Sequence, residues 1–163
     1  MKNPIVRLPK PLARGFSVLN RAMITASRHR LGSRFRSAPV ILLTTTGRTT
    51  GKARTWPLVG LPVENELERG PDADEPDGRR GGWAVAASNC GHDEHPGWYL
   101  NLLANPRATV GDRGLVVEVH ARDTTRPERN ELLERFVLLY GGYADYEHAT
   151  DRVIPVLMLE PVT

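Results

Sequence analysis

Residues 39–61 read PVILLTTTGRTTGKARTWPLVGL, and this stretch decides the fold. Residues 39–46 are a run of apolar and β-branched residues of strand length that begins with a proline and ends before a glycine. A polar loop, residues 47–52, follows this run. Residues 54–61 form a second extended run, in which Pro57 permits only an edge or bulged strand. The stretch therefore predicts a β-hairpin with a long tip bounded by glycines.

The rest of the chain adds short strands and few helices. Apolar and alternating runs predict strands at residues 83–88, 107–110, 115–122 and 153–159 and helices at residues 96–105 and 125–140. In the second helix Thr125 is the expected N-cap, and the expected buried face comprises Leu132, Leu133, Phe136, Val137 and Tyr140. Long helices do not separate the strands regularly, and no Gly-x-Gly-x-x-Gly turn follows a strand, which argues against a Rossmann sheet. The pattern predicts a mainly β fold, an antiparallel barrel with flanking helices.

The charge of the chain is unevenly distributed. Residues 1–63 contain twelve Lys or Arg and no Asp or Glu, whereas residues 64–80 contain seven acids and three arginines. A basic first third points to an anionic partner, which is a phosphate-bearing cofactor, a lipid headgroup or a nucleic acid. Nucleic acid is the least favoured, because no recognition fold surrounds the basic residues. The alternative is that the arginines only solvate exposed faces.

An amphipathic helix is predicted near the N-terminus. One apolar face is formed by Leu12, Phe16, Leu19 and Met23, and arginines occupy another face. Such a helix either caps a barrel core or lies in a lipid interface. The expected organisation is a basic helical segment at residues 1–36 and a barrel domain at residues 37–163, with an acidic loop insert at residues 64–82.

Two features bear on the compartment. Cys90 is the single cysteine, so no internal disulfide can form, which fits a reducing compartment. No segment has the roughly 20 consecutive apolar residues of a membrane-spanning helix, and arginines interrupt the N-terminal region where a signal peptide needs an apolar core. We expect a cytoplasmic protein, monomeric or weakly dimeric, with peripheral contact to the inner face of the cell membrane through the N-terminal helix.

The hairpin tip and the tryptophans are the first candidate binding features. The tip, residues 47–54, offers three cations, several hydroxyl groups and two glycines that let backbone amides approach an anion. It lacks the spacing of a P-loop, and a solvated tip remains the alternative. Trp56, Trp83 and Trp98 provide flat surfaces for a planar ring, or they pack in the core.

Three further clusters suggest chemistry. Cys90, His92 and His95 supply three ligand types, but no clean fourth ligand is present, so we expect no metal site. Ser88 lacks the Gly-x-Ser-x-Gly elbow of a hydrolase. Tyrosines recur every third residue at 140, 143 and 146, and they either wall an aromatic substrate pocket and donate a proton or form a packing cluster.

A series of motifs extends from about residue 38 to the end, apart from the acidic insert. The hairpin carries Leu42-Leu43-Thr44-Thr45-Thr46-Gly47-Arg48, Gly51-Lys52-Ala53-Arg54 and Pro57-Leu58. These are followed by Val85-Ala86-Ala87-Ser88, by His95-Pro96-Gly97-Trp98-Tyr99-Leu100-Asn101-Leu102-Leu103-Ala104-Asn105-Pro106, and by Tyr140, Tyr143, Tyr146 and Asp151-Arg152-x-Ile154-Pro155. In this order the motifs resemble the deazaflavin-dependent nitroreductase and quinone reductase family of actinobacteria.

The resemblance implies a split β-barrel of the FMN-binding-like type that binds coenzyme F(420), a deazaflavin with a phosphate and an oligoglutamate tail. It implies that the tail lies along the hairpin and the ring near the later motifs. The implied cofactor-binding residues are Arg48, Thr49, Thr50, Lys52, Arg54, Thr55, Trp56, Pro57, Leu58, Ala86, Ala87, Ser88, Asn89, Gly97, Trp98, Tyr99, Leu100 and Asn101. The implied catalytic, substrate-side residues are Ser88, Tyr140, Tyr143 and Tyr146.

The function implied by the resemblance is hydride transfer from reduced coenzyme F(420) to a small electron acceptor that is quinone-like or nitroaromatic. Two residues depart from the family pattern. Asn89 stands where many members have lysine, and Val59 replaces an aromatic residue. The alternatives are an FMN-binding split-barrel protein and a non-catalytic module that binds the deazaflavin or a membrane surface.

Overall fold

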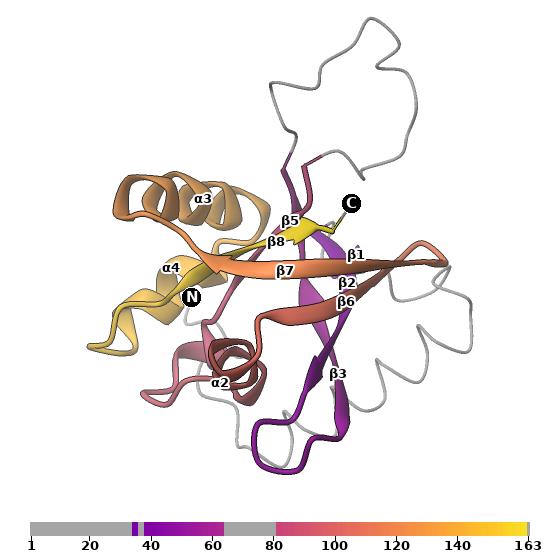
Figure 1. Cartoon of the computed structure of the whole chain (residues 1–163). Coiled ribbons are helices and arrows are strands. Elements are labelled where there is room, and N and C mark those ends of the chain that lie inside the picture. Colours follow the sequence, from indigo (N-terminus) through magenta and orange to yellow (C-terminus); the bar gives the residue numbers. More distant parts are fainter. Residues whose placement is uncertain (1–33, 36–37, 64–80, 163) are drawn as a thin grey trace, which may run out of the picture.

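An antiparallel sheet that curls into a half-barrel makes up most of the structure (Figure 1). The computed structural model describes residues 34–35, 38–63 and 81–162. The strands are β1 (Arg34–Phe35), β2 (Ala38–Thr46), β3 (Ala53–Val59), β4 (Leu61–Pro62), β5 (Trp83–Ala86), β6 (Arg107–Asp112), β7 (Leu115–Asp123) and β8 (Val156–Pro161). Their order in the sheet is β1-β2-β6-β7-β8-β5-β4, and β3 pairs with β2. The predicted mainly β, antiparallel architecture is confirmed.

The predicted hairpin is present as β2 and β3. Their register runs from Val40 opposite Val59 to Thr46 opposite Ala53. Among the described strands β3 pairs with β2 alone, as expected for a strand that contains a proline. The second predicted run is divided at Gly60, whose amide donates to the carbonyl of Pro39 at 3.1 Å. A Cβ at Gly60 would lie 2.8 Å from the Ile41 side chain, so a glycine lets the chain between β3 and β4 pass this close to β2.

Within residues 38–63 and 81–162, three α-helices and one short 3-10 turn accompany the sheet. They are η2 (Asn89–Gly91), α2 (Gly97–Ala104), α3 (Arg126–Leu139) and α4 (Gly142–His148). Thr125 caps α3 as predicted, in a capping box with Glu128. Figure 1 shows α3 and α4 together beside the sheet and α2 near the lower end of the β2–β3 hairpin. The structure thus adds a helix, α4, where the sequence indicated only a short aromatic segment.

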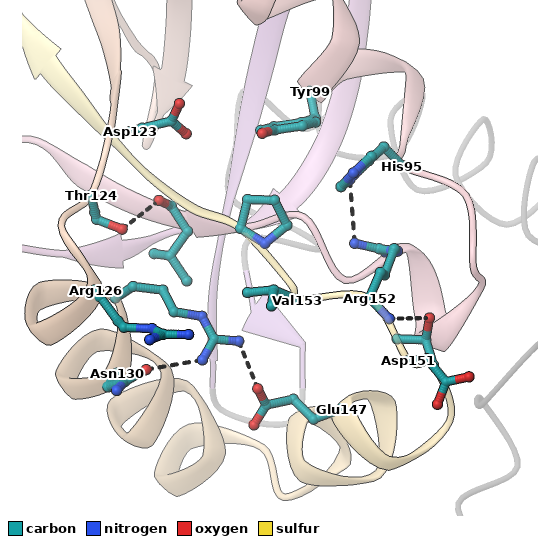
Figure 2. Close-up of a pocket in the computed structure, with 14 residues that line it drawn as sticks. His95, Tyr99, Asp123, Thr124, Arg126, Asn130, Glu147, Asp151, Arg152 and Val153 are labelled. Carbon is teal, nitrogen blue, oxygen red and sulfur yellow. Dashed lines mark hydrogen bonds and ion pairs between the residues drawn. The ribbon is translucent and has the colours of Figure 1, made fainter.

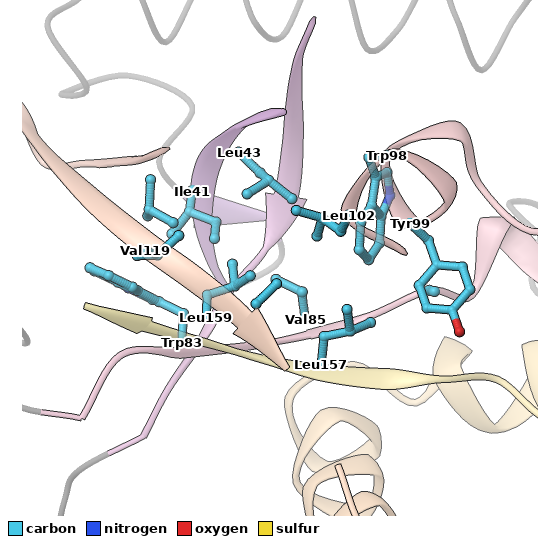
Figure 3. Close-up of a cluster of buried hydrophobic side chains, with 13 residues drawn as sticks. Ile41, Leu43, Trp83, Val85, Trp98, Tyr99, Leu102, Val119, Leu157 and Leu159 are labelled. Carbon is cyan, nitrogen blue, oxygen red and sulfur yellow. The ribbon is translucent and has the colours of Figure 1, made fainter. Parts of the chain in front are cut away.

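Two apolar cores lie on opposite faces of the central strands. The inner core contains buried side chains of Ile41, Leu43, Trp83, Val85, Val110, Val119, Leu157 and Leu159, and α2 contributes Trp98 and Leu102 to it (Figure 3). The outer core lies beneath α3 and α4 and contains Ala84, Leu132, Leu133, Phe136, Tyr140, Ile154, Val156 and Met158. Alternation along β8 explains the division, because successive side chains point to opposite faces.

The last strand has a central position, between β7 and β5. It begins at Val156 and not at Val153 as predicted, because Val153 is 66% exposed and the chain joins the ladder only after Pro155. The strand predicted at residues 83–88 also ends early, at Ala86. Beyond it, the Ala87 amide donates to the Pro155 carbonyl at 2.8 Å and the chain turns away at Ser88.

Residues 1–33 and 64–80 lie outside the described residues, and so do the predicted N-terminal helix and most of the acidic insert. The two chain ends that flank the insert are paired, since the Val63 amide donates to the Gly82 carbonyl at 3.1 Å. Gly82 has φ +90°, and a Cβ there would lie 2.1 Å from the Leu159 carbonyl oxygen. Within the described part of the chain, no helix is long and apolar enough to span a lipid bilayer.

Candidate active site

The hairpin tip is a closed loop that presents cations outward. The Gly47 amide donates to the Lys52 carbonyl at 2.8 Å, and the Gly51 amide donates to the Gly47 carbonyl at 2.7 Å. Gly51 has φ +65°, a conformation that favours glycine. The side chains of Arg48, Lys52 and Arg54 are exposed, and no ion pair joins them to a carboxylate of the described residues. The tip therefore carries three cations that are available to an anionic ligand.

Helix α2 is fastened to the hairpin by one buried side chain. Asn101 is 5% exposed and lies on α2. Its Oδ1 accepts from the Arg48 amide at 3.1 Å, and its Nδ2 donates to Thr45 Oγ1 at 3.0 Å. One face of α2 thus fixes the base of the tip, so the predicted tail segment and the predicted ring segment are adjacent in space.

The indole of Trp56 lies beside the first residue of α2. A Cβ at Gly97 would lie 3.7 Å from Trp56 Cζ2, so the helix approaches the ring closely at this glycine. The Trp56 Nε1 atom is buried and has no hydrogen-bond partner among the described residues. Buried polar groups are paired in the great majority of cases, so an unpaired one indicates a partner that the described residues do not supply.

The other residues of α2 point in different directions, as helix geometry requires. Trp98 and Leu102 face the inner core, and Figure 3 shows Tyr99 at its rim with the hydroxyl directed away from the cluster. Tyr99 stacks on His95, with ring centroids 4.9 Å apart. Of the residues predicted to meet the ring, Gly97 and Asn101 therefore face the hairpin, whereas Tyr99 faces the opposite side of the helix.

The segment after β5 is a tight left-handed turn. Asn89, Cys90 and Gly91 have φ values of 48°, 52° and 76°. For residues other than glycine this conformation costs roughly 1–2 kcal/mol each, and Asn tolerates it better than most. Asn89 also donates from Nδ2 to the Glu94 carbonyl at 2.8 Å. The positive φ and this contact both suit an asparagine at position 89.

Helix α4 packs directly on this turn. A Cβ at Gly91 would lie 2.8 Å from the Ala149 side chain and 3.4 Å from the Tyr146 backbone. The Tyr146 hydroxyl hydrogen-bonds to the Cys90 thiol, while burial raises the pKa of that thiol. The half-buried Cys90 is therefore protonated at neutral pH and is not activated as a nucleophile.

The three tyrosines predicted on the substrate side form one cluster. Tyr140, Tyr143 and Tyr146 are 8%, 6% and 5% exposed. The Tyr143 ring centroid lies 6.1 Å from that of Tyr140 and 5.6 Å from that of Tyr146, in edge-on contacts. Burial raises the pKa values of Tyr143 and Tyr146, and the neighbouring Cys90 and Tyr140 raise them further. Both phenols therefore keep their protons at neutral pH.

The predicted site residues fall into two contacting groups. The first joins the tip to α2 through Arg48, Asn101, Trp56 and Gly97. The second joins the turn after Ser88 to the tyrosine cluster through Cys90 and Tyr146. Of the other predicted residues, Thr49 and Thr50 are exposed on the tip, and Thr55 hydrogen-bonds to Thr44. The inner core includes Leu58, Leu100 and Ala87, and Ala86 packs against the outer core.

Arg152 hydrogen-bonds to both ends of the turn after β5. Its guanidinium donates from Nη2 to the carbonyls of Ala87 and Ser88, at 3.0 and 2.9 Å. Nε donates to the His92 carbonyl at 2.9 Å. The sequence indicated Arg152 only as part of a motif and assigned it no role, because partners about sixty residues away leave no local signal.

An open, mixed-charge groove lies on the far side of Arg152 (Figure 2). Its volume is about 1150 Å³, and its walls include His95, Tyr99, Asp123, Arg126, Arg129, Glu147, Asp151 and Arg152. Arg129 is engaged there, since it donates to the Ile154 carbonyl at 3.0 Å and to Glu147 at 2.6 Å. Acidic and basic side chains balance along the groove, so its charge selects no single ligand class.

Comparison with known families gives a consistent result. Residues 18–68 and 77–161 match the model of the F(420)H(2)-dependent quinone reductase family. A putative F(420)H(2)-dependent quinone reductase from Mycobacterium tuberculosis is 31% identical over 133 residues, which cover 81% of this chain and 98% of that protein.

Two solved structures are similar in fold. An F(420)-H(2) dependent reductase, FDR-A, superposes with a TM-score of 0.60 at 36% identity, over 75% of this chain and 94% of that one. A protein described as a domain-swapped dimer superposes with a TM-score of 0.62 at 32% identity, over 94% of this chain and 100% of that one. The first of these likenesses confirms the expected split-barrel type of fold.

Proposed function

The chain belongs to the F(420)H(2)-dependent quinone reductase family, and we propose that the residues described above carry out that family's reaction. The chain is an oxidoreductase, and its cofactor is coenzyme F(420). When bound in its reduced form, the coenzyme supplies the hydride. The assignment rests on the contact between the cationic tip and α2, and on the Trp56 indole beside Gly97, whose buried N–H has no partner among the described residues.

The residues on both sides of this join fit the coenzyme. Arg48, Lys52 and Arg54 suit a phosphate and an oligoglutamate tail, since several converging cations bind such groups strongly. Trp56 Nε1 can donate to a polar edge of the ring system. Gly97 leaves room at the start of α2 that a larger side chain would fill.

We assign the turn after β5 and the tyrosine cluster to the acceptor side. Ser88 precedes the turn, and Tyr146 touches it through Cys90. Burial raises the pKa of Tyr146, so it stays a neutral phenol on the acceptor side and gives up its proton reluctantly. Tyr143 is enclosed by its neighbours, including Phe136 at 5.0 Å between ring centroids, and supports the others.

The family indicates a quinone as the electron acceptor, and nitroaromatics are the second class of acceptor to test. For a lipid-dissolved quinone, peripheral membrane contact through residues 1–36 would assist access, as their apolar and basic pattern suggests. Co-sedimentation with anionic liposomes, with and without residues 1–36, tests this part alone. Equal sedimentation of the two forms would exclude membrane contact through that segment.

Because one solved relative is a domain-swapped dimer, light scattering of the purified chain tests for the same assembly.

The central experiment is anaerobic oxidation of reduced F(420), followed by visible absorbance, against quinones, nitroaromatics and enones. Binding titrations with F(420) and with FMN accompany it. Turnover with a quinone supports the proposal. Tight FMN binding without F(420) binding, or F(420) binding with no turnover on any acceptor, would replace it with an FMN protein or a non-catalytic module.

Arginine variants test the tail site separately. Arg48→Ala and Arg54→Ala are expected to weaken F(420) binding about tenfold each, through loss of charge-assisted hydrogen bonds. Arg113→Asn is the matched control, since Arg113 is an exposed arginine at the β6–β7 tip and has φ 45°, which Asn tolerates. Equal weakening in all three variants would indicate a general charge effect and remove the tail assignment.

A further inference from the structure

We propose that Arg152 is the positioning residue of the site, which holds the turn at residues 87–92 in its working shape and fixes His95 as a hydrogen-bond donor through Nε2. The proposal deepens the proposed function and rests on it, because that turn is the segment assigned to the acceptor side. Arg152 itself need not touch coenzyme or acceptor.

The first support is the number and direction of its contacts. One guanidinium nitrogen, Nη2, donates to two consecutive carbonyls, of Ala87 and Ser88, at 3.0 and 2.9 Å. Nε holds the His92 carbonyl at the other end of the turn, at 2.9 Å. The single guanidinium group thus hydrogen-bonds to both ends of the segment 87–92. Lysine cannot reproduce this, because its ammonium is a point donor without the fork geometry.

The second support is the strain of the segment between those two ends. Asn89, Cys90 and Gly91 all have positive φ, and two of them are not glycine. Such a conformation persists only where the surroundings impose it. Packing of α4 against Gly91 presses on one side of the turn, and Arg152 holds the other. Without the guanidinium, the carbonyls of Ala87 and Ser88 lose a charged donor and the backbone can relax to ordinary dihedral angles.

The third support concerns His95. Arg152 Nη1 lies 3.3 Å from His95 Nδ1. A guanidinium only donates, so Nδ1 must be the acceptor and the ring proton resides on Nε2. Burial lowers the pKa of His95, and the Arg152 charge lowers it further, so the ring is neutral at neutral pH. His95 stacks on Tyr99 and forms part of the groove wall (Figure 2), which gives the Nε2 proton a defined direction.

Arg152 is itself held in place. Its amide faces Thr150 Oγ1 at 3.4 Å, and that hydroxyl donates to Asp93 at 2.9 Å. Asp93 also favours the charged guanidinium electrostatically. The segment before β8 and the segment before α2 are therefore cross-linked at two points. This arrangement makes Arg152 a rigid brace and not a mobile surface side chain.

The expected consequence is a division between coenzyme binding and turnover. The coenzyme tail is assigned to the hairpin tip, which Arg152 does not contact, whereas the acceptor is assigned to the turn. Loss of the brace should lower kcat about tenfold or more and change the dissociation constant of F(420) by less than about threefold. A merely structural role would lower the melting temperature without this division.

The experiment compares Arg152→Lys and Arg152→Met with Arg122→Lys and Arg122→Met. Arg122 is a matched control, since it is also half-buried and makes forked bonds to Glu128 at 2.8 and 3.0 Å and a bond to Glu160 at 2.6 Å, away from the turn. Four quantities are measured: melting temperature, F(420) dissociation constant, kcat with KM, and the ¹⁵N shifts of the His95 ring.

We expect both Arg152 variants, when folded at the assay temperature, to lose kcat and to show a mixture of His95 tautomers. We expect the Arg122 variants to change only the melting temperature. An Arg152→Lys protein with wild-type kcat and an unchanged His95 tautomer would overturn the proposal, as would equal losses of kcat in the Arg122 variants. If the wild-type chain itself shows no turnover, the proposed function fails. The His95 tautomer and amide exchange of residues 88–92 then still decide whether Arg152 holds the turn.

Discussion

Single side chains connect distant segments at this site. Asn101 satisfies both the Arg48 amide and the Thr45 hydroxyl from within one helix. Arg152 satisfies three carbonyls of one turn. Asn101 is buried and Arg152 is half-buried, and in such places an unmade hydrogen bond costs more than a made one contributes. Replacement of either residue should therefore affect the geometry of a segment beyond its own contact.

Asn101→Ala should lower both stability and coenzyme affinity. The change leaves the Arg48 amide and the Thr45 hydroxyl without their partner, which costs about 1–3 kcal/mol of unfolding free energy. It also frees the tip, so F(420) binding should weaken about tenfold. Urea unfolding and fluorescence titration measure the two effects. Asn105→Ala is the control, because the Asn105 side chain accepts from the nearby Arg107 amide and not from the tip. A similar loss of affinity in Asn105→Ala would refute the special role of Asn101.

Protonation of His95 should destabilise the protein in mild acid. Its folded-state pKa lies below the usual value of 6.5 because of burial and the Arg152 charge. Between the folded and unfolded pKa values the unfolded chain binds more protons, so stability is complete above about pH 6.5 and falls as the pH drops below it. Melting temperatures between about pH 8 and about pH 5 measure this slope. His95→Gln should flatten it, and an unchanged slope would assign the effect to other groups.

At the scale of elements, α3 shows how local signals determine a helix. Thr125 accepts from the Glu128 amide at 3.4 Å, and Glu128 accepts from the Thr125 amide at 3.3 Å. Glu128 also receives the Arg122 guanidinium, whose hydrogen bonds lower the pKa of Glu128. The capping box thus joins α3 to β7 as well as starting the helix.

Thr125→Ala should therefore cost about 1 kcal/mol of unfolding free energy, the usual effect of losing an N-cap. For a chain of this length the melting temperature should fall by roughly 2–4 °C. F(420) affinity should not change, because α3 has no contact with the tip. Calorimetry and a binding titration check both statements, and Thr125→Ser should restore the melting temperature. A loss of affinity in Thr125→Ala would show coupling between α3 and the cofactor site.

Elements with strong periodicity were predictable, and those shaped by distant contacts were not. The hairpin, β7 and α3 were predicted because apolar spacing and caps specify them locally. The left-handed turn at Asn89–Gly91 has carbonyl contacts to Arg152, about sixty residues away, and the Pro155 carbonyl just before β8 pairs with the distant Ala87 amide. The site was predictable as two segments, the tip and the start of α2. Asn101 was among the residues indicated, but its bonds to the tip were not.

At the scale of the whole molecule, the two chain ends that flank the acidic residues 64–80 are held together by the sheet. Val63 and Gly82 pair across its base. The family model matches residues 18–68 and 77–161, so the residues between these ranges have no counterpart in it. We therefore expect the folding of the sheet not to depend on residues 69–76.

Deletion of residues 69–76 should leave the melting temperature within about 2 °C of wild type, since loop length alone changes closure entropy little. F(420) affinity should also be retained. Gly82→Ala is the contrasting variant, because its Cβ would lie 2.1 Å from the Leu159 carbonyl oxygen and the residue has φ +90°. That substitution should destabilise the protein severely. A deletion as damaging as Gly82→Ala would mean that the insert is part of the folding unit.

The central position of β8 has a consequence for biosynthesis. Of the described strands it is the last to leave the ribosome, yet it separates β7 from β5 and supplies side chains to both cores. Until it emerges, β3, β2, β6 and β7 can pair in that order as an antiparallel sheet, while β5 lacks its neighbour. Arg152, which lies just before β8, can bind the Ser88 carbonyl only once this last part of the chain has emerged. We therefore expect the nascent chain to form its cation-rich tip early and the turn bound by Arg152 late, so that a ribosome stalled before residue 152 would display the tip without that turn.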